Sequence, residues 1–254
     1  MNLCNMTIEM GARSGIVAPD ATTLTWLKGR PKALQETAWQ IAIDHWHALQ
    51  KDDNARFEKE VSIRADSVLP MVTRGTAPDQ VTAVTGFIPI HDVHCDALLY
   101  MGLSAGQAIC NISIDQAFIG PCTNGRFSDL LAASYALKNR KVRVPLLISP
   151  DSMMIANRVH SAGLVEIFKN AGATWASSGC SLCVGMNGDL IAPKARCAPS
   201  SNCNFRGRQG PAARTHLMSP AMVAAAAVAG RLVDVRAMGG IESSSSSNEA
   251  VLHN

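Results

Sequence analysis

The stretch that decides the fold is residues 116–125, which read Gln-Ala-Phe-Ile-Gly-Pro-Cys-Thr-Asn-Gly. A short apolar run ends abruptly at Gly120 and Pro121, residues typical of turns. Apolar residues then recur at helical spacing at Leu130, Leu131, Ala133 and Leu137. The stretch therefore predicts a strand over 116–119, a turn that carries Cys122, and a helix behind it.

The same alternation continues towards the C-terminus. Residues 142–148 and 174–177 are predicted strands, and residues 152–170 between them are a predicted helix. Strands that alternate with helices favour a parallel sheet with right-handed crossovers, so the fold class is α/β. Cys122 and the Cys180/Cys183 pair then each follow a strand. Because ligands bind at the carboxyl ends of strands in open α/β sheets, these cysteines can share one crevice.

The rest of the chain divides around this region. Apolar residues have helical spacing over 4–17 and 31–50, with Trp39, Ile43, Trp46 and Leu49 on one face, and these helices are predicted to face a core. Glycines and prolines break residues 74–107, and Ser219-Pro220 begins a predicted helix that ends near Leu232. The predicted parts are residues 1–73, a connector over 74–112, an α/β domain over 113–240, and a disordered serine-rich tail over 241–254.

Composition excludes several classes of protein. The chain has 254 residues, 47% of them hydrophobic, which is enough to bury a core. A formal charge of +3, scattered Lys and Arg, and few aromatic residues argue against nucleic acid as a partner. The longest apolar stretch, near residues 218–228, is too short to span a membrane. Eight cysteines in a chain of this length favour a reducing cytoplasm over a disulfide-stapled secreted protein.

The cysteine spacing suggests a metal. A structural zinc site requires four protein ligands, but Cys122, Cys180 and Cys183 make one Cys-x-x-Cys pair and one distant singleton. Three thiolates can hold three irons of a cubane cluster and leave the fourth iron open to substrate, as a Lewis acid. A redox pair on a thioredoxin-like unit, or two buried cysteines with this spacing by chance, are the alternatives.

Other candidates carry weaker signals. Cys197 and Cys203 are expected to be structural, and His91, His94 and Cys95 are expected to form an exposed loop rather than a metal tract. Residues 200–210 combine small residues, amides and closely spaced arginines. Such a loop suits carboxylates, because a guanidinium matches a carboxylate with two parallel hydrogen bonds, although a solvated basic turn has the same composition.

Together, several ordered motifs resemble the aconitase family. They are residues 118–126, 179–189 (Gly-Cys-Ser-Leu-Cys-Val-Gly-Met-Asn-Gly-Asp), 200–210 (Ser-Ser-Asn-Cys-Asn-Phe-Arg-Gly-Arg-Gln-Gly) and 214–222 (Arg-Thr-His-Leu-Met-Ser-Pro-Ala-Met). Residues 3–12 and 69–76 match further segments. Within the family, the motifs are most similar to the large subunit of 3-isopropylmalate dehydratase, the isomerase of leucine biosynthesis. The resemblance implies three-layer aconitase-like domains, with residues 1–73 as the remainder of an upstream one.

The resemblance also implies a chemistry. Cys122, Cys180 and Cys183 would hold one 4Fe-4S cluster per chain, whose open iron would draw electrons from the substrate hydroxyl so that water leaves and returns. Asn5, Glu9, Asn202 and Arg208 match residues that contact a small dicarboxylic acid substrate. The catalytic serine of the family lies on a swivelling domain, which in the isopropylmalate enzymes is the small subunit. A partner chain is therefore implied, and no catalytic residue is assigned here.

The sequence departs from the family pattern at several positions. Cys203 stands where the family has an arginine, and losing such a charge-assisted contact costs about 1.5–3 kcal/mol. Pro121, Arg74 and Asp151 replace the usual serine, tryptophan and glycine, and Asp151 would be strained if its turn needed a positive φ.

The family segments upstream of residue 1 are missing from this sequence. We therefore expect exposed apolar helix faces, a possible partner that supplies the upstream half, weak iron binding and little activity of the isolated chain. Two functions remain open: the cluster-bearing component of a hydro-lyase, or a catalytically inert metal-binding or assembly fragment.

Overall fold

The structure is a computed structural model that describes residues 2–91, 95–121, 123–185 and 188–239. The chain forms two compact units, whose described parts are residues 2–64 and 65–239. Residues 74–112, which the sequence predicts to be a connector, lie within the second unit. The predicted serine-rich tail lies outside the described residues.

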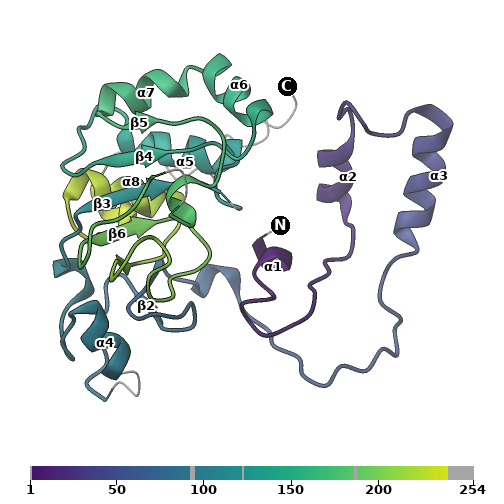
Figure 1. Ribbon diagram of the computed structural model, residues 1–254. Coiled ribbons are helices and arrows are strands. Elements are labelled where there is room, and N and C mark those ends of the chain that lie inside the picture. Colours follow the sequence, from purple (N-terminus) through teal and green to yellow (C-terminus); the bar gives the residue numbers. More distant parts are fainter. Residues whose placement is uncertain (1, 92–94, 122, 186–187, 240–254) are drawn as a thin grey trace. The chain divides into compact units, whose positions relative to one another are not determined.

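The second unit is built on a parallel sheet, shown in Figure 1. Its strands are β3 (Gln116–Ile119), β4 (Leu146–Ile148), β5 (Thr174–Trp175), β6 (Arg196–Pro199) and β7 (Arg214–Thr215). They lie in the order β5-β4-β3-β6-β7, and every neighbouring pair is parallel. The predicted α/β class and mainly parallel sheet are confirmed.

Helices cover one face of this sheet. They are α5 (Phe127–Leu137), α6 (Met153–Ser161), α7 (Leu164–Ala171) and α8 (Pro220–Ala229). In β3, Ala117 and Ile119 point into the main core together with α5, α7 and α8. Phe118, between them, points to the opposite face, because successive side chains of a strand alternate.

The opposite face is covered by loops and a short 3₁₀ turn, η3 (Ser181–Cys183). There Phe118 and Cys197 pack against Leu182, Ile191 and Ala213 in a second hydrophobic cluster. The sheet is therefore the middle of three layers. The loops that contain the cysteine pair form the third layer.

Some predicted boundaries of helices and strands differ from the observed ones, and the conformation at the helix ends explains why. The predicted helix 152–170 is divided into α6 and α7, because Gly163 adopts a left-handed conformation with φ 71°. Only the last part of the predicted strand 142–148 is a strand. The N–H groups of Val142 and Arg143 donate instead to the carbonyls of Ala171 and Ala227, near the ends of α7 and α8.

The helix predicted from Ser219-Pro220 is present, with Pro220 at its first position, although the Ser219 side chain makes no cap hydrogen bond. Residues 74–107 contain a strand and a helix that the sequence does not predict. Strand β2 (Val81–Ala83) pairs antiparallel with β1 (Met71–Thr73), and α4 (Cys95–Met101) follows. Short 3₁₀ turns are η1 (Ala65–Ser67), η2 (Ile109–Asn111) and η4 (Val235–Met238).

The first unit contains α1 (Asn2–Asn5), α2 (Ala21–Leu27) and α3 (Glu36–His47). The predicted helix over 4–17 is wrong: α1 ends at Asn5, and Gly11, at φ 85°, lies in the turns that follow. Helix α3 confirms most of the prediction for 31–50. Its Trp39 and Trp46 rings meet edge to face, with centroids 5.8 Å apart.

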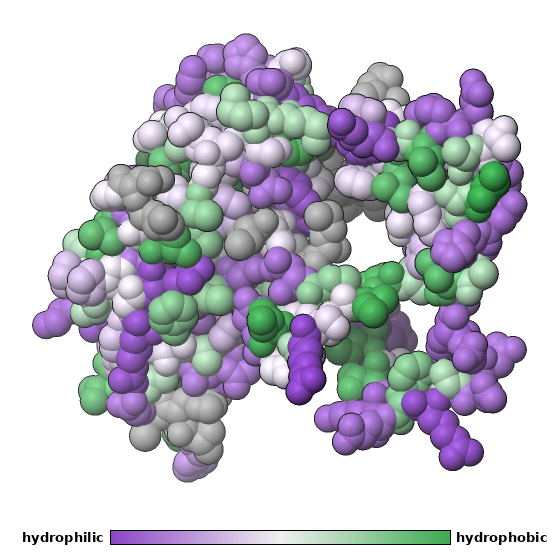
Figure 2. Space-filling model, turned by 45° about the vertical axis from the view of Figure 1, so that its right-hand side comes forward, coloured by the Kyte–Doolittle hydropathy of each residue, from purple (hydrophilic) through white to green (hydrophobic). Residues whose placement is uncertain are grey.

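No described side chain of residues 3–64 is buried. The predicted core-facing stripe of α3 is only half-buried at Trp39, Ile43 and Trp46, and Leu49 is exposed. Apolar side chains therefore lie at the surface of this unit, where Figure 2 shows them in green. Among the described residues, no helix is long and apolar enough to cross a membrane.

Candidate metal centre

The three motifs around the cysteines follow three different strands. Residues 120–125, which we call the Cys122 turn, follow β3, and residues 180–183, the cysteine turn, come after β5. Residues 200–213, the arginine loop, follow β6. All three leave the carboxyl edge of the sheet, and the chain changes direction between β3 and β6. A crevice at such a switch point is the usual binding position in an open α/β sheet.

Hydrogen bonds join the Cys122 turn to the arginine loop. The Ser200 hydroxyl accepts from the Gly120 N–H at 3.1 Å and donates to the Gly120 carbonyl at 3.3 Å. The Asn124 amide donates to the Ser200 carbonyl at 2.6 Å. Thr123, the neighbour of Cys122, donates its hydroxyl to Asn202 Oδ1 at 3.2 Å, and both residues are buried.

Ser149, at the end of β4, holds the segment that leads to the cysteine turn. Ser149, fully buried directly after β4, has its hydroxyl 2.9 Å from the Ser177 carbonyl and 3.0 Å from the Gly179 carbonyl, to which it donates. Its N–H donates to the Ile119 carbonyl at the end of β3. Ser149 thereby fixes the segment before Cys180 against the neighbouring strand end.

The cysteine turn places its two thiols in different environments. Cys180 is exposed, whereas Cys183 is only 2% exposed, and the Cys183 N–H donates to the Cys180 carbonyl at 2.9 Å. Ser181 between them adopts φ 45°, which is unusual for a residue other than glycine. Its hydroxyl donates to Asp189 Oδ2 at 2.6 Å, and this bond supports the unusual conformation.

The arginine loop binds the cysteine turn through two consecutive side chains. Arg208 Nε donates to the Cys183 carbonyl at 2.8 Å, and its Nη2 lies 3.9 Å from the Cys183 sulfur. Gln209 Nε2 donates to the Leu182 carbonyl at 2.9 Å. The guanidinium thereby places a positive charge beside the Cys183 sulfur.

Two buried polar atoms of the arginine loop make no hydrogen bond to the described residues: Ser201 Oγ and Asn204 Oδ1. Asn204 is held from its other end, where Nδ2 donates to the Gly75 carbonyl at 2.8 Å. Unsatisfied buried polar atoms are costly and need an explanation, such as a bound group. Since Ser200, Asn202 and Gln209 are buried as well, the loop is not a solvated basic turn.

These features fit an iron–sulfur cluster as far as the described residues extend. They supply two thiols of one Cys-x-x-Cys pair, a guanidinium beside one sulfur, and unpaired polar atoms in the adjoining loop. The predicted third ligand, Cys122, lies outside the described residues. Within the described part of the chain, no group of three or more His, Cys, Asp or Glu is placed to hold a metal ion.

The predicted substrate residues fall in both units. Asn202 is buried beside Thr123, and Arg208 is half-buried against Cys183. Asn5 ends α1 and Glu9 lies in the following turns, both in the first unit, so their substrate role stays a prediction. Asp151 does not adopt a positive φ, so the strain considered for this position does not arise.

The remaining cysteines differ in burial. Cys197 is fully buried in β6, and burial raises the pKa of its thiol, which keeps it protonated. Cys203 is half-buried in the arginine loop. The sequence predicts an exposed loop at His91, His94 and Cys95. His91 is exposed, His94 lies outside the described residues, and the prediction is wrong at Cys95, which begins α4.

Sequence reasoning missed His216, which is fully buried after β7. Its Nε2 is 3.0 Å from Arg196 Nη1, which can only donate, so Nε2 accepts and Nδ1 carries the proton that it donates to the Thr73 carbonyl at 2.7 Å. Burial, together with the charge of Arg196, lowers the pKa of His216 to about 3. Burial also lowers the pKa of Arg196 to about 10.

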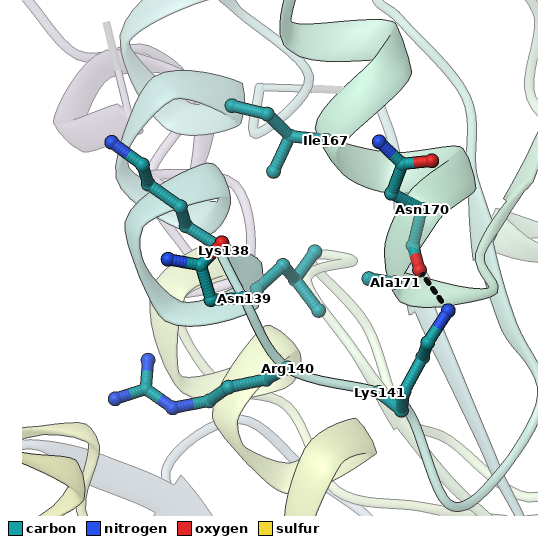
Figure 3. A pocket seen from close by; sticks show the side chains of 8 residues that line it. Lys138, Asn139, Arg140, Lys141, Ile167, Asn170 and Ala171 are labelled. Atoms are coloured by element: carbon teal, nitrogen blue, oxygen red, sulfur yellow. Dashed lines mark hydrogen bonds between the residues drawn. The ribbon is translucent and has the colours of Figure 1, made fainter.

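A surface hollow of about 400 Å³ lies at the other edge of the sheet, between the ends of α5 and α7 (Figure 3). Its lining includes Lys138, Arg140 and Lys141. Lys141 Nζ donates to the Asn170 carbonyl at 2.6 Å, and Arg140 donates to the Ala136 carbonyl at 3.2 Å. These cations stabilise helix C-termini, which explains their presence without a ligand.

A known family matches most of the chain. The model of the aconitase family (aconitate hydratase) matches residues 1–230.

Proposed function

The chain belongs to the aconitase family, a family of iron–sulfur hydro-lyases, and from this membership we propose that it is the cluster-bearing component of a hydro-lyase. The proposed reaction is the exchange of 2-isopropylmalate and 3-isopropylmalate by dehydration and rehydration, with a small swivel-domain subunit as partner. One observation carries the proposal: hydrogen bonds join the Cys122 turn and the cysteine turn to one arginine loop.

Each group of this site has a proposed task. Cys122, Cys180 and Cys183 would hold a 4Fe-4S cluster, which when bound supplies an iron that acts as a Lewis acid on a substrate hydroxyl. Arg208 would bind a substrate carboxylate. Its Nε and Nη2 are directed at Cys183, and its Nη1 makes no hydrogen bond within the described residues. The half-buried side chain leaves that nitrogen available for a charge-assisted bond.

The buried polar atoms complete the proposed substrate surface. Asn202 has its Oδ1 fixed by Thr123, which orients its amide N–H groups. Ser201 Oγ, which is buried without a hydrogen-bond partner among the described residues, can donate to an anionic oxygen. A small dicarboxylate would satisfy Ser201 Oγ better than an apolar ligand.

The proposal is tested by substrate turnover after anaerobic reconstitution with iron and sulfide. The reconstituted chain is mixed with a small subunit of an isopropylmalate enzyme, and interconversion of the two isopropylmalates is followed by proton NMR. We expect turnover that needs both chains and is lost in Arg208→Gln. A cluster-loaded mixture that is inactive on isopropylmalate, citrate and other hydroxy acids with two or three carboxylates would contradict a hydro-lyase role.

A second function has one specific observation in its favour. Cys203 in the arginine loop stands where the family has an arginine, so one carboxylate contact is missing. The alternative is therefore a metal-binding or assembly fragment without catalysis. It predicts the same cluster spectrum, with no dicarboxylate binding and no turnover.

A further inference from the structure

We propose that Gln209 is a positioning residue for the Cys180/Cys183 pair. It is fully buried, and its side-chain amide uses both ends. Nε2 donates to the Leu182 carbonyl at 2.9 Å, inside the cysteine turn, and Oε1 accepts from the Thr215 hydroxyl at 2.9 Å, at the end of β7. One amide thus connects the cysteine turn directly to the sheet.

The backbone around Gln209 is fixed on both sides. Its carbonyl accepts from the Ile191 N–H at 2.8 Å. The Tyr100 hydroxyl of α4 accepts from the Gly207 N–H at 3.3 Å and donates to the Ala213 carbonyl at 2.9 Å, so it closes residues 207–213 at both ends. Because these hydrogen bonds hold the backbone of the arginine loop in place, the Gln209 side chain can hold the cysteine turn in one position.

Gln209 and Arg208 therefore have separable tasks. Arg208 is half-buried and faces Cys183 with a charge. Gln209 is enclosed, and its contact with the cysteine turn is a hydrogen bond to the Leu182 carbonyl, between the two cysteines. The second hydrophobic cluster contains Leu182 and Cys183, so a turn that moves away from Gln209 also uncovers Cys183. Burial of Cys183 at 2% is thus a direct measure of whether the turn is in place.

The inference rests on the proposed function for its meaning, because it assumes that the pair binds iron, but its first test does not need iron. In the cluster-free full chain, alkylation of Cys180 and Cys183 by iodoacetamide is measured by mass spectrometry at one pH. Gln209→Met keeps the length of the side chain and removes its hydrogen bonds to Leu182 and Thr215, together with its contact with the Cys197 thiol. Thr215→Val is the matched control, since it removes only the bond that does not reach the cysteine turn.

We expect Gln209→Met to raise the rate of Cys183 alkylation relative to Cys180 by about fivefold or more, the change in local opening that follows loss of one buried hydrogen bond. Thr215→Val should leave the ratio near that of the natural protein. After reconstitution with iron and sulfide, Gln209→Met should change the electron paramagnetic resonance spectrum of the cluster, and Thr215→Val should not.

An unchanged ratio in folded Gln209→Met, or an equal rise in Thr215→Val, would overturn the positioning role. If Gln209→Met does not fold, Gln209→Asn decides, because it keeps a neutral amide but is one methylene shorter, which takes its N–H out of reach of the Leu182 carbonyl. The same rise in the ratio is expected. If the natural protein takes up no iron, the proposed function fails while the alkylation ratio still decides the role of Gln209.

Discussion

At the scale of single residues, His216 couples the stability of the second unit to pH. Its pKa is lowered to about 3 in the folded chain, from an ordinary value of 6.5, by burial first and by Arg196 second. The folded chain therefore keeps His216 neutral while the unfolded chain takes up a proton below about pH 6.5. The unfolded state binds more protons in this window, so stability is lost as the pH falls from 6.5 towards 3.

We expect the free energy of unfolding to fall by up to about 1.4 kcal/mol per pH unit from this group. Urea unfolding between pH 7 and about pH 5.5 measures the slope, above the range where most carboxylates titrate. His216→Gln is the control: it should be less stable at pH 7 but show a flatter slope. An equal slope in both proteins would show that His216 is not the acid-sensitive group.

Replacement of Cys203 is expected to change the affinity for the substrate. Under the proposed function, Cys203→Arg should tighten binding of 2-isopropylmalate to the reconstituted protein by about tenfold or more, because a charge-assisted hydrogen bond contributes about 1.5–3 kcal/mol. Isothermal titration calorimetry measures the affinity, and Cys203→Gln is the uncharged control. Equal affinities in the two variants would exclude a carboxylate contact at this position.

At the scale of elements, Gly210 fixes the arginine loop. It adopts φ 147°, and an added Cβ would clash with the Ile191 carbonyl oxygen. Gly106 has φ 76° with no atom within 4 Å of an added Cβ. Gly106→Ala should cost about 1–2 kcal/mol for the backbone conformation alone, and Gly210→Ala should cost clearly more. Urea midpoints at constant m-value compare the two. Equal losses would show that the contact with Ile191 is relaxed without cost.

Elements that depend on local patterns were predictable from the sequence. The strand 116–119 is confirmed at both ends, because an apolar run is followed directly by Gly120 and Pro121. Strands β6 and β7 were missed. They are four and two residues long, contain Arg196, Pro199 and Arg214, and owe their existence to parallel pairing next to β3, which no local pattern encodes.

Part of the candidate site was also predictable from local patterns in the sequence. The order of strands and turns indicated that the cysteine turn and the Cys122 turn share one edge. The bonds from Gln209 and Arg208 to Leu182 and Cys183 cross about 25 residues of sequence and depend on the third layer of the fold. The hydrogen bond from Gln209 to the cysteine turn is therefore known only from the tertiary structure.

At the scale of the whole molecule, the two units differ in what holds them together. The second unit has its core between the sheet and α5, α7 and α8, whereas no described side chain of residues 3–64 is buried. Protection against hydrogen exchange requires buried hydrogen-bonded structure. We expect amides of β3, β4 and α8 to exchange only through global unfolding, and those of α2 and α3 to exchange orders of magnitude faster. Comparable protection in α3 would show that this unit has a core of its own.

We propose that this chain holds an iron–sulfur cluster through Cys122, Cys180 and Cys183. The most direct measurement is anaerobic reconstitution with iron and sulfide, followed by ultraviolet–visible and electron paramagnetic resonance spectra of the natural chain, Cys122→Ser and Cys197→Ser. We expect a cluster signal in the natural chain. Cys197→Ser should keep this signal, and Cys122→Ser should lose or alter it. No signal in the natural chain, or the same signal in Cys122→Ser, would contradict this proposal.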